Sequence, residues 1–303
     1  MIKIDSRLKE KIDKREKFFI AEIQPPMHGN AKAFREDLKN YKGKVIAFGI
    51  NDNRTQVGMS ALAAASIAVS EKLEPILHMI TRDRNRIALI SDILGAEALG
   101  IVNLLITSGE HHTLGNYKKA KRVFDIDSIQ LLKTASTLSH DANLVDEKKI
   151  PLNPFYLGAA VDPYADPVDL QMIRLNKKIL AGANYVITKP VFDIDRFKTW
   201  LDKINELGID KKIAIIAGIR VFKNAEHVET LAKTRPNPMI PDELLKRMKS
   251  KSKETDQRKE GLNIAMEIIQ KLSSLKAVKG FQISGEDDHE GLLEIIEKSG
   301  LGG

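Results

Sequence analysis

Short apolar or β-branched runs alternate with longer amphipathic stretches along this chain, in about eight repeats typical of βα units. The predicted strands are Phe18–Gln24, Val45–Asn51, Pro75–Thr81, Asn103–Ser108, Tyr156–Asp162, Tyr185–Val191, Lys212–Ile219 and Gly280–Ser284. The predicted helices are 31–40, 57–72, 86–99, 126–142, 167–182, 193–207, 257–275 and 289–299. Eight βα units are the number that closes a (β/α)8 barrel, so we predict an α/β protein with this TIM-barrel fold.

Two segments depart from the regular alternation. Residues 1–17 are polar and predict an extra N-terminal helix, without the apolar region of a signal peptide. The connection from Arg220 to Gln257 is long and holds Pro236, Pro238 and Pro241, and we interpret it as an excursion from the barrel. No Pro/Gly/Ser-rich linker divides the chain, so we expect residues 1–303 to form a single barrel domain.

The composition excludes several classes of protein. The chain has no cysteine, which removes disulfides, thiolate zinc sites, iron–sulfur ligation and thiol nucleophiles. Hydrophobic residues make up 43% and aromatic residues 5%, which favours an aliphatic core. No apolar run is long enough to span a bilayer, and we expect a cytoplasmic protein without membrane contact.

The net charge of +7 raises the question of nucleic-acid binding. The most basic run, Leu244–Lys259, has no interleaved aromatic residues, which single-strand binders use to stack bases. A solvated helix face is the favoured interpretation, and we expect no nucleic-acid partner. Nucleic-acid binding is kept as a hypothesis that salt-dependent binding to oligonucleotides would test.

Polar residues gather where the predicted strands end, which is where barrel proteins place their functional groups. The set comprises Glu22, Gln24, Asn51, Asp52, Asn53, His78, Thr81, Arg82, Asp83, Ser108, Gly109, Glu110, Asp162, Thr188, Lys189 and Arg220.

Glu22 interrupts the apolar strand FFIAEIQPP. Burial there would raise the pKa of its carboxyl and let it keep a proton near neutral pH, as a general acid must. The alternative is an ion pair with Lys178 or Lys189 inside the barrel mouth. Spacing alone leaves the two interpretations equally weighted.

The other polar positions point to ligand binding less directly. His78 ends a strand, and its alternative role is a neutral imidazole bonded to a backbone carbonyl. Ser108-Gly109-Glu110-His111-His112 has metal-ligating residue types, but neighbouring side chains on a loop rarely face one ion, so we expect no metal. Gly109 would instead let the backbone approach a planar ligand or a phosphate. The chain has no phosphate-binding P-loop and no G-x-G-x-x-G after a strand.

Several motifs, in the same order, resemble the methylenetetrahydrofolate reductase family over nearly the whole chain. They are AEIQPP at 21–26, EPILHMITRDRNRIALISDILGAEALGIVNLLITSGE at 74–110, VFDIDSIQLL at 123–132, GAAVDPYADP at 158–167, LNKKILAGANYVITKPVFD at 175–193, AIIAGI at 214–219 and GLNIAMEII at 261–269. They are most similar to the anaerobic, acetogen-like branch of the family.

This resemblance implies a flavoprotein of one-carbon metabolism, connected to methionine biosynthesis. Reduced FAD would pass a hydride to 5,10-methylenetetrahydrofolate, in a reversible reaction that gives 5-methyltetrahydrofolate. Glu22 matches the family's general acid, and Glu110 falls where the family has an aspartate near flavin and pterin. The implied FAD-lining residues are His78, Ser108, Gly109, Phe124, Asp127, Asp162 and Lys178, with Gln24 and Lys189 as folate contacts.

The chain also departs from the family pattern. Lys189 stands where the family has glutamine, Arg220-Val221 replaces a rigid turn, and GFQISGEDD brings carboxylates to a lining expected to be apolar and basic. These departures motivate an alternative, a flavin-free pterin-binding barrel that acts as a methyltransferase or partner subunit. The resemblance leaves the electron donor open among NADH, NADPH, ferredoxin and a partner subunit, and it allows a homo-oligomer or a hetero-complex.

Overall fold

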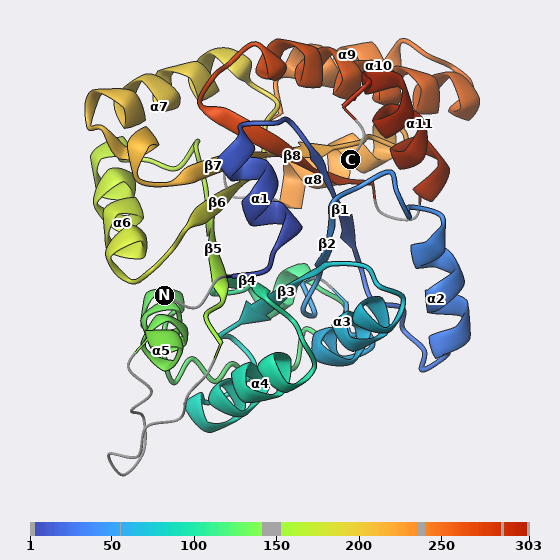
Figure 1. The fold of residues 1–303 in the computed structure, drawn as a ribbon. Coiled ribbons are helices and arrows are strands. Elements are labelled where there is room, and N and C mark those ends of the chain that lie inside the picture. Colours follow the sequence, from blue (N-terminus) through green and yellow to red (C-terminus); the bar gives the residue numbers. More distant parts are fainter. Residues whose placement is uncertain (1–3, 55, 141–152, 235–239, 286–287, 302–303) are drawn as a thin grey trace.

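The computed structural model describes residues 4–54, 56–140, 153–234, 240–285 and 288–301 (Figure 1). Its strands form a closed parallel barrel in sequence order, confirming the predicted (β/α)8 fold. The strands are β1 Phe19–Ile23, β2 Ala47–Ile50, β3 Pro75–Ile80, β4 Asn103–Thr107, β5 Tyr156–Val161, β6 Tyr185–Pro190, β7 Ala214–Arg220 and β8 Val278–Ser284. The barrel closes where Phe19 of β1 lies opposite Phe281 of β8.

Helices surround the barrel between successive strands (Figure 1). They are α2 Ala31–Lys39, α3 Ala61–Ser70, α4 Arg86–Ala98, α5 Ser128–His140, α6 Val168–Leu180, α7 Ile194–Glu206, α10 Glu254–Ser273 and α11 His289–Ser299, with short 3-10 turns at His112–Leu114 and Ile209–Lys211. Each corresponds to a predicted helix, although α3 begins four residues later than the pattern indicated, after a loop that follows β2.

The long connection after β7 contains two helices that the sequence did not predict. They are α8, Ala225–Thr234, and α9, Asp242–Lys249. Tertiary contacts hold α9, because Arg247 forms ion pairs with Glu260 and Glu267 of α10. Its basic character therefore belongs to a surface helix with acidic partners.

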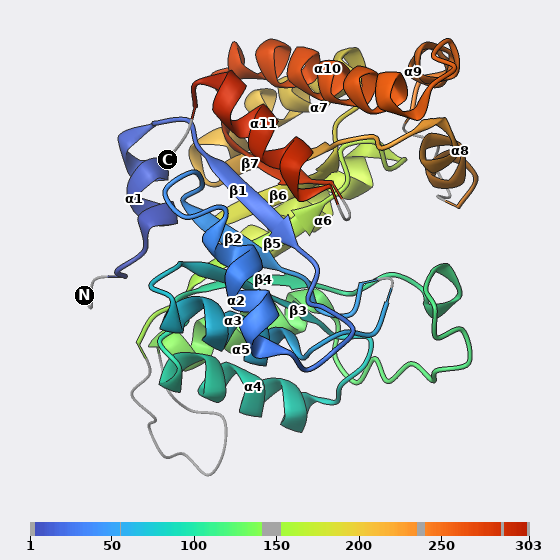
Figure 2. The same cartoon turned by 90° about the vertical axis from the view of Figure 1, so that its right-hand side faces the viewer.

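The extra N-terminal helix is present as α1, Arg7–Lys14, and it covers the amino-terminal end of the barrel. Leu8 is fully buried and joins the apolar cluster inside the barrel with Phe18 and Tyr185. The hydroxyl of Ser6 caps this helix and donates to Asn103 Oδ1 at 2.7 Å. In Figure 2, α1 lies at the left-hand end of the barrel and the loop after β4 extends from the opposite end.

A second, larger apolar core lies between the barrel and its helices. Among the described residues, no helix is both long enough and apolar enough to cross a membrane.

Candidate functional site

A cavity of about 430 Å³ lies at the carboxyl end of the strands, within the size range of small-molecule pockets. Its lining includes residues from several strand ends: Glu22, Asn51, Asp52, Arg54, His78, Gly109, Glu110, Thr188, Lys189 and Gln282. The structure therefore brings together Glu22, Glu110, His78, Gly109 and Lys189 of the predicted set.

Hydrogen-bond donors surround the carboxylate of Glu22 on both oxygens. Asn51 Nδ2 donates to Oε1 at 3.0 Å, Arg54 Nη1 donates to the same oxygen at 2.9 Å, and Gln282 Nε2 donates to Oε2 at 2.5 Å. The side chain is only 10% exposed. Glu22 is thus held as a buried carboxylate within a preformed set of donors.

The predicted direction of the Glu22 pKa shift is wrong for this arrangement. Burial acts as expected and raises the pKa, but Arg54, His78, Asn51 and Arg220 together outweigh it and lower the pKa to about 2. Hydrogen bonds and opposite charges favour the ionised form more than desolvation disfavours it. The alternative partners were also wrong, since the ion pair of Glu22 is with Arg54, not Lys178 or Lys189.

His78 is a neutral side chain at the floor of the cavity. Its Nδ1 lies 3.1 Å from Asn51 Oδ1, and burial lowers its pKa to about 4. Its Nε2 has no hydrogen-bond partner among the described residues. Gly49 of β2 leaves space beside it, because a Cβ there would lie 3.0 Å from both His78 Nε2 and Gln282 Oε1. His78 therefore offers an unused polar atom next to the Glu22 network.

Gly109 needs to be glycine for two reasons. Its φ is +83°, in the left-handed region, and a Cβ would lie 3.2 Å from the Cβ of Arg82. The bare backbone thus lines the cavity at this point, as a site for a planar ligand requires.

The remaining predicted residues lie around this cavity without lining it. Asp162 forms an ion pair with Lys189 at 2.8 Å. Lys178 is partly buried, donates to the carbonyl of Ala160 at 2.6 Å, and has a pKa lowered by burial to about 8. Ser108 Oγ donates to Ser128 Oγ at 3.1 Å.

Phe124, Asp127 and Gln24 complete the predicted set. Phe124 is 45% exposed with φ +43°, and Asp127 bonds the backbone of Gln130 at the start of α5. Gln24 follows β1, and its buried Nε2 has no hydrogen-bond partner among the described residues.

Sequence reasoning missed two residues of the site, Arg54 and Gln282. Gln282 lies inside the motif GFQIS of β8, and the signal that could have found it is a polar residue that interrupts an otherwise apolar strand segment. Arg54 belongs to a loop, where no periodicity indicates the direction of a side chain. The carboxylates of the C-terminal motif are partly located: Asp288 pairs with Arg258, and Glu286 and Asp287 lie outside the described residues.

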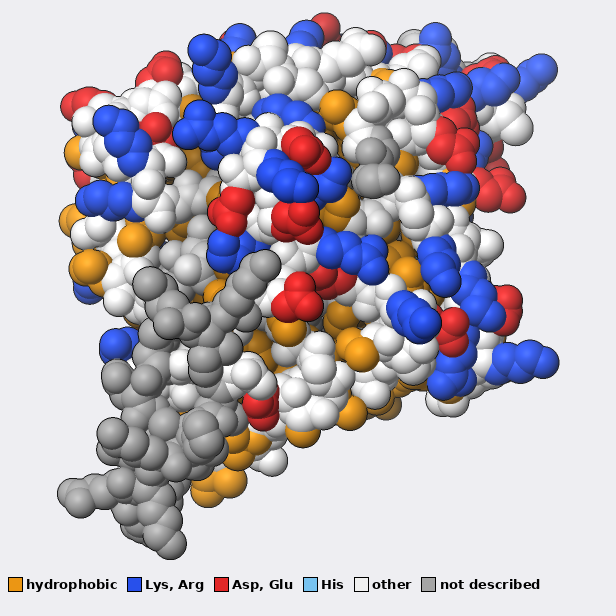
Figure 3. Space-filling model, in the orientation of Figure 1, with side chains coloured by type: hydrophobic (Ala, Val, Ile, Leu, Met, Phe, Trp, Pro, Cys, Tyr) orange, Lys and Arg blue, Asp and Glu red, His pale blue; other side chains and the backbone are white. Residues whose placement is uncertain are grey.

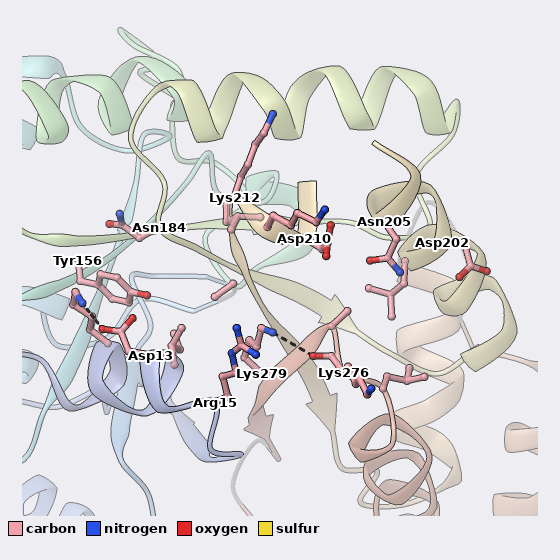
Figure 4. Close-up of a pocket in the computed structure, with 18 of the residues that line it drawn as sticks. Asp13, Arg15, Tyr156, Asn184, Asp202, Asn205, Asp210, Lys212, Lys276 and Lys279 are labelled. Carbon is pink, nitrogen blue, oxygen red and sulfur yellow. Dashed lines mark hydrogen bonds and ion pairs between the residues drawn. The ribbon is translucent and has the colours of Figure 1, made fainter. Parts of the chain in front are cut away.

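A larger cavity of about 990 Å³ lies at the amino-terminal end, beside α1 (Figure 4). Its cationic lining residues are Lys9, Arg15, Lys198, Lys211, Lys212, Lys276 and Lys279. Lys9 pairs with Asp13 in the same cavity, and Lys279 donates to the carbonyl of Lys276. Because barrels place their chemistry at the carboxyl end, the smaller cavity is the candidate active site.

Within the described residues, no group of three or more His, Asp or Glu side chains is arranged to hold a metal ion. Asp83 and His112 approach each other at 2.9 Å, but the other partner of Asp83 is the guanidinium of Arg82.

These features define a (β/α)8 barrel with a buried, hydrogen-bonded carboxylate site at the carboxyl ends of its strands. The family model for methylenetetrahydrofolate reductase matches residues 7–300, and the chain belongs to this family.

Individual relatives agree with the family. A probable methylenetetrahydrofolate reductase (NADPH) from Caenorhabditis elegans is 22% identical over 98% of this chain and 44% of its own length. The 5,10-methylenetetrahydrofolate reductase of Salmonella typhimurium is 31% identical over 40% of both chains. The chain therefore spans less than half of the length of these relatives.

A solved structure shares the fold. It is an uncharacterized protein from Clostridium thermocellum that binds two copies of 5-methyl-5,6,7,8-tetrahydrofolic acid. The TM-score is 0.67 at 15% identity, over 97% of this chain and 98% of that one. At this identity the likeness supports the fold.

Proposed function

We propose that this chain is a flavin-dependent reductase that converts 5,10-methylenetetrahydrofolate to 5-methyltetrahydrofolate, in a reversible reaction. Family membership supports this proposal, and so does the folate that the structural neighbour binds. The observation that carries it is Glu22, a buried carboxylate set among donors at the open end of the barrel. The resemblance assigns its position to the general acid.

The residues around the cavity fit a flavin. Gly109, with its left-handed φ, lines the cavity with bare backbone, and His78 Nε2 offers a buried polar atom without a partner among the described residues. Lys178 keeps its charge at neutral pH, because its pKa of about 8 lies above 7, and is proposed to hold the diphosphate of FAD. The bound flavin would supply the hydride.

The protein side chains would orient the folate and supply a proton. Glu22 is ionised in this structure, so it would first take up a proton from water, and it is then proposed to pass that proton to a ring nitrogen of the substrate. Asn51 and Gln282 fix the directions of its two oxygens. His78 is neutral at pH 7, since its pKa is about 4, and it adds no charge beside the acid. Glu110 and Lys189, which also line the cavity, are proposed to contact the folate.

The test is the visible spectrum of the purified protein before and after anaerobic addition of 5-methyltetrahydrofolate. We expect a flavin spectrum that bleaches, and Glu22→Gln should prevent bleaching while FAD stays bound. Glu16→Gln, at an exposed ion pair of the N-terminal segment, is the matched control and should bleach normally. Bleaching by the Glu22→Gln protein at the normal rate would show that the acid is assigned wrongly.

A second candidate is the flavin-free pterin-binding barrel. The observation that favours it is the ion pair between Lys189 and Asp162, which places a cation where the resemblance implies an amide. This candidate requires folate binding without retention of FAD, which the same purified protein would reveal.

A further inference from the structure

Arg54 stands between two cavities at the open end of the barrel. It lines the candidate active site and also a neighbouring cavity of about 300 Å³. That second cavity is bounded by His112, Asn116 and Tyr117 of the loop after β4. Because the Arg54 side chain lines both cavities, its direction affects the space available in each of them.

The guanidinium of Arg54 connects the two carboxylates that we assign to the reaction. Its Nη1 lies 2.9 Å from Glu22 Oε1, and its Nε lies 3.5 Å from Glu110 Oε1. Exposed fractions are 25% for Arg54, 10% for Glu22 and 19% for Glu110. The cation thus occupies the space between two carboxylates that a substrate would have to contact.

The backbone that carries Arg54 is tied to the loop after β4 through Arg82. Arg82 donates to the carbonyls of Asn53 at 2.8 Å, Arg54 at 3.4 Å and Glu110 at 2.7 Å. Arg82 is 4% exposed and is itself held by Asp83. The two loops are thus joined at their backbones, and the Arg54 side chain can change its direction by rotation about its own bonds without separating them.

We propose that Arg54 is an internal competitor for the substrate site: its guanidinium holds Glu22 and Glu110 in the empty protein and swings toward the neighbouring cavity when folate binds. This proposal rests on the proposed function. It predicts that the site is specific for ligands whose own N–H groups replace the guanidinium on these carboxylates.

Displacement of Arg54 would also change the protonation of Glu22. The groups that face Glu22 are Arg54 and Asn51 after β2, His78 of β3, Arg220 of β7 and Gln282 of β8. Burial raises the pKa of Glu22 and the positive charge of Arg54 lowers it. When Arg54 moves away, the effect of burial is less opposed, so the pKa of Glu22 rises from about 2. Substrate binding would thereby prepare the general acid.

Arg54→Gln tests the competitor in two independent measurements. The first is an infrared titration of the Glu22 carboxyl in the protein without folate, with Glu22→Gln used to identify the band. We expect the Glu22 band to titrate at a higher pH in Arg54→Gln than in the unmodified protein. This measurement needs no catalytic activity, so it stands even if the proposed reaction fails.

The second measurement is the Kd of 5-methyltetrahydrofolate. Arg54 would leave only about a tenth of the molecules able to bind folate, and the apparent Kd is the intrinsic Kd divided by that fraction. Removal of Arg54 should therefore tighten binding about tenfold. Arg86→Gln is the matched control, because Arg86 pairs with Asp125 in an exposed ion pair, and it should leave both readouts unchanged. Unchanged or weaker folate binding by Arg54→Gln, or an unchanged Glu22 titration, would overturn the proposal.

Discussion

At the scale of single residues, the site is governed by opposing effects on proton affinity. Glu22 and His78 are both buried, yet their neighbours act differently on them. Positive charge and hydrogen-bond donors keep Glu22 ionised. At His78 burial lowers the pKa most, the charge of Glu22 raises it and the charge of Arg54 lowers it, so the imidazole stays neutral. The resulting site pairs a fixed carboxylate with an uncharged imidazole at neutral pH.

The depressed pKa of His78 makes stability depend on pH. The unfolded chain binds a proton at this histidine near pH 6.5, but the folded protein does so only near pH 4. The effect of His78 on the free energy of unfolding is therefore fully favourable above pH 6.5. Below pH 6.5 the unfolded chain gains a proton that the folded protein does not bind, so this stability is lost as the pH falls toward 4, by about 3 kcal/mol for a shift of this size. Urea unfolding at pH 7 and pH 4.5 should show a smaller acid loss in His78→Gln. An equal loss in both proteins would contradict this expectation.

At the scale of elements, α1 has a structural role that its polar sequence conceals. Most of its residues face solvent, but Leu8 enters the apolar cluster inside the barrel, and Glu74 accepts the backbone N–H of Leu8 at 3.1 Å. The helix therefore covers the apolar cluster inside the barrel at its amino-terminal end.

Leu8→Ala should destabilise the protein by about 2–5 kcal/mol, because it leaves a cavity in a closed core. Leu180→Ala removes the same atoms from a side chain that is 75% exposed, and it should cost less than about 1 kcal/mol. Denaturant unfolding of the two variants gives the comparison. A similar small cost for both would mean that α1 frays without consequence for the barrel.

The elements differ in how well the sequence predicted them. β3 and β4 are buried in the barrel wall and consist mostly of apolar residues, so their pattern indicated strands clearly. In contrast, α8 and α9 lie on either side of the proline-bearing segment, and Arg247 of α9 forms ion pairs with residues of the next helix, α10, which no periodicity within α9 indicates. Glu22 was found because it interrupts a strand, whereas the loop residue Arg54, which reverses the expected pKa shift, was not.

At the scale of the whole molecule, positive charge is distributed rather than concentrated on the candidate site. Figure 3 shows Lys and Arg side chains interspersed with Asp and Glu on the face that carries α1. In the basic run, Lys249 pairs with Glu229, and Arg247 pairs with residues of α10. Near the amino-terminal cavity, Asp13, Asp202 and Asp210 accompany the lysines. Such mixed charge gives a weak and screened attraction for polyanions.

Thermal unfolding with different ligands should therefore separate a folate protein from a nucleic-acid binder. A ligand at one hundred times its Kd stabilises the folded state by about 2.7 kcal/mol, which raises Tm measurably. We expect 5-methyltetrahydrofolate to raise the Tm of the FAD-loaded protein and an oligonucleotide at physiological salt to leave it unchanged. The folate effect should disappear at low ligand concentration and be weaker in Glu22→Gln. A Tm that rises with the oligonucleotide and falls back as salt is added would instead assign the positive charge to nucleic-acid binding.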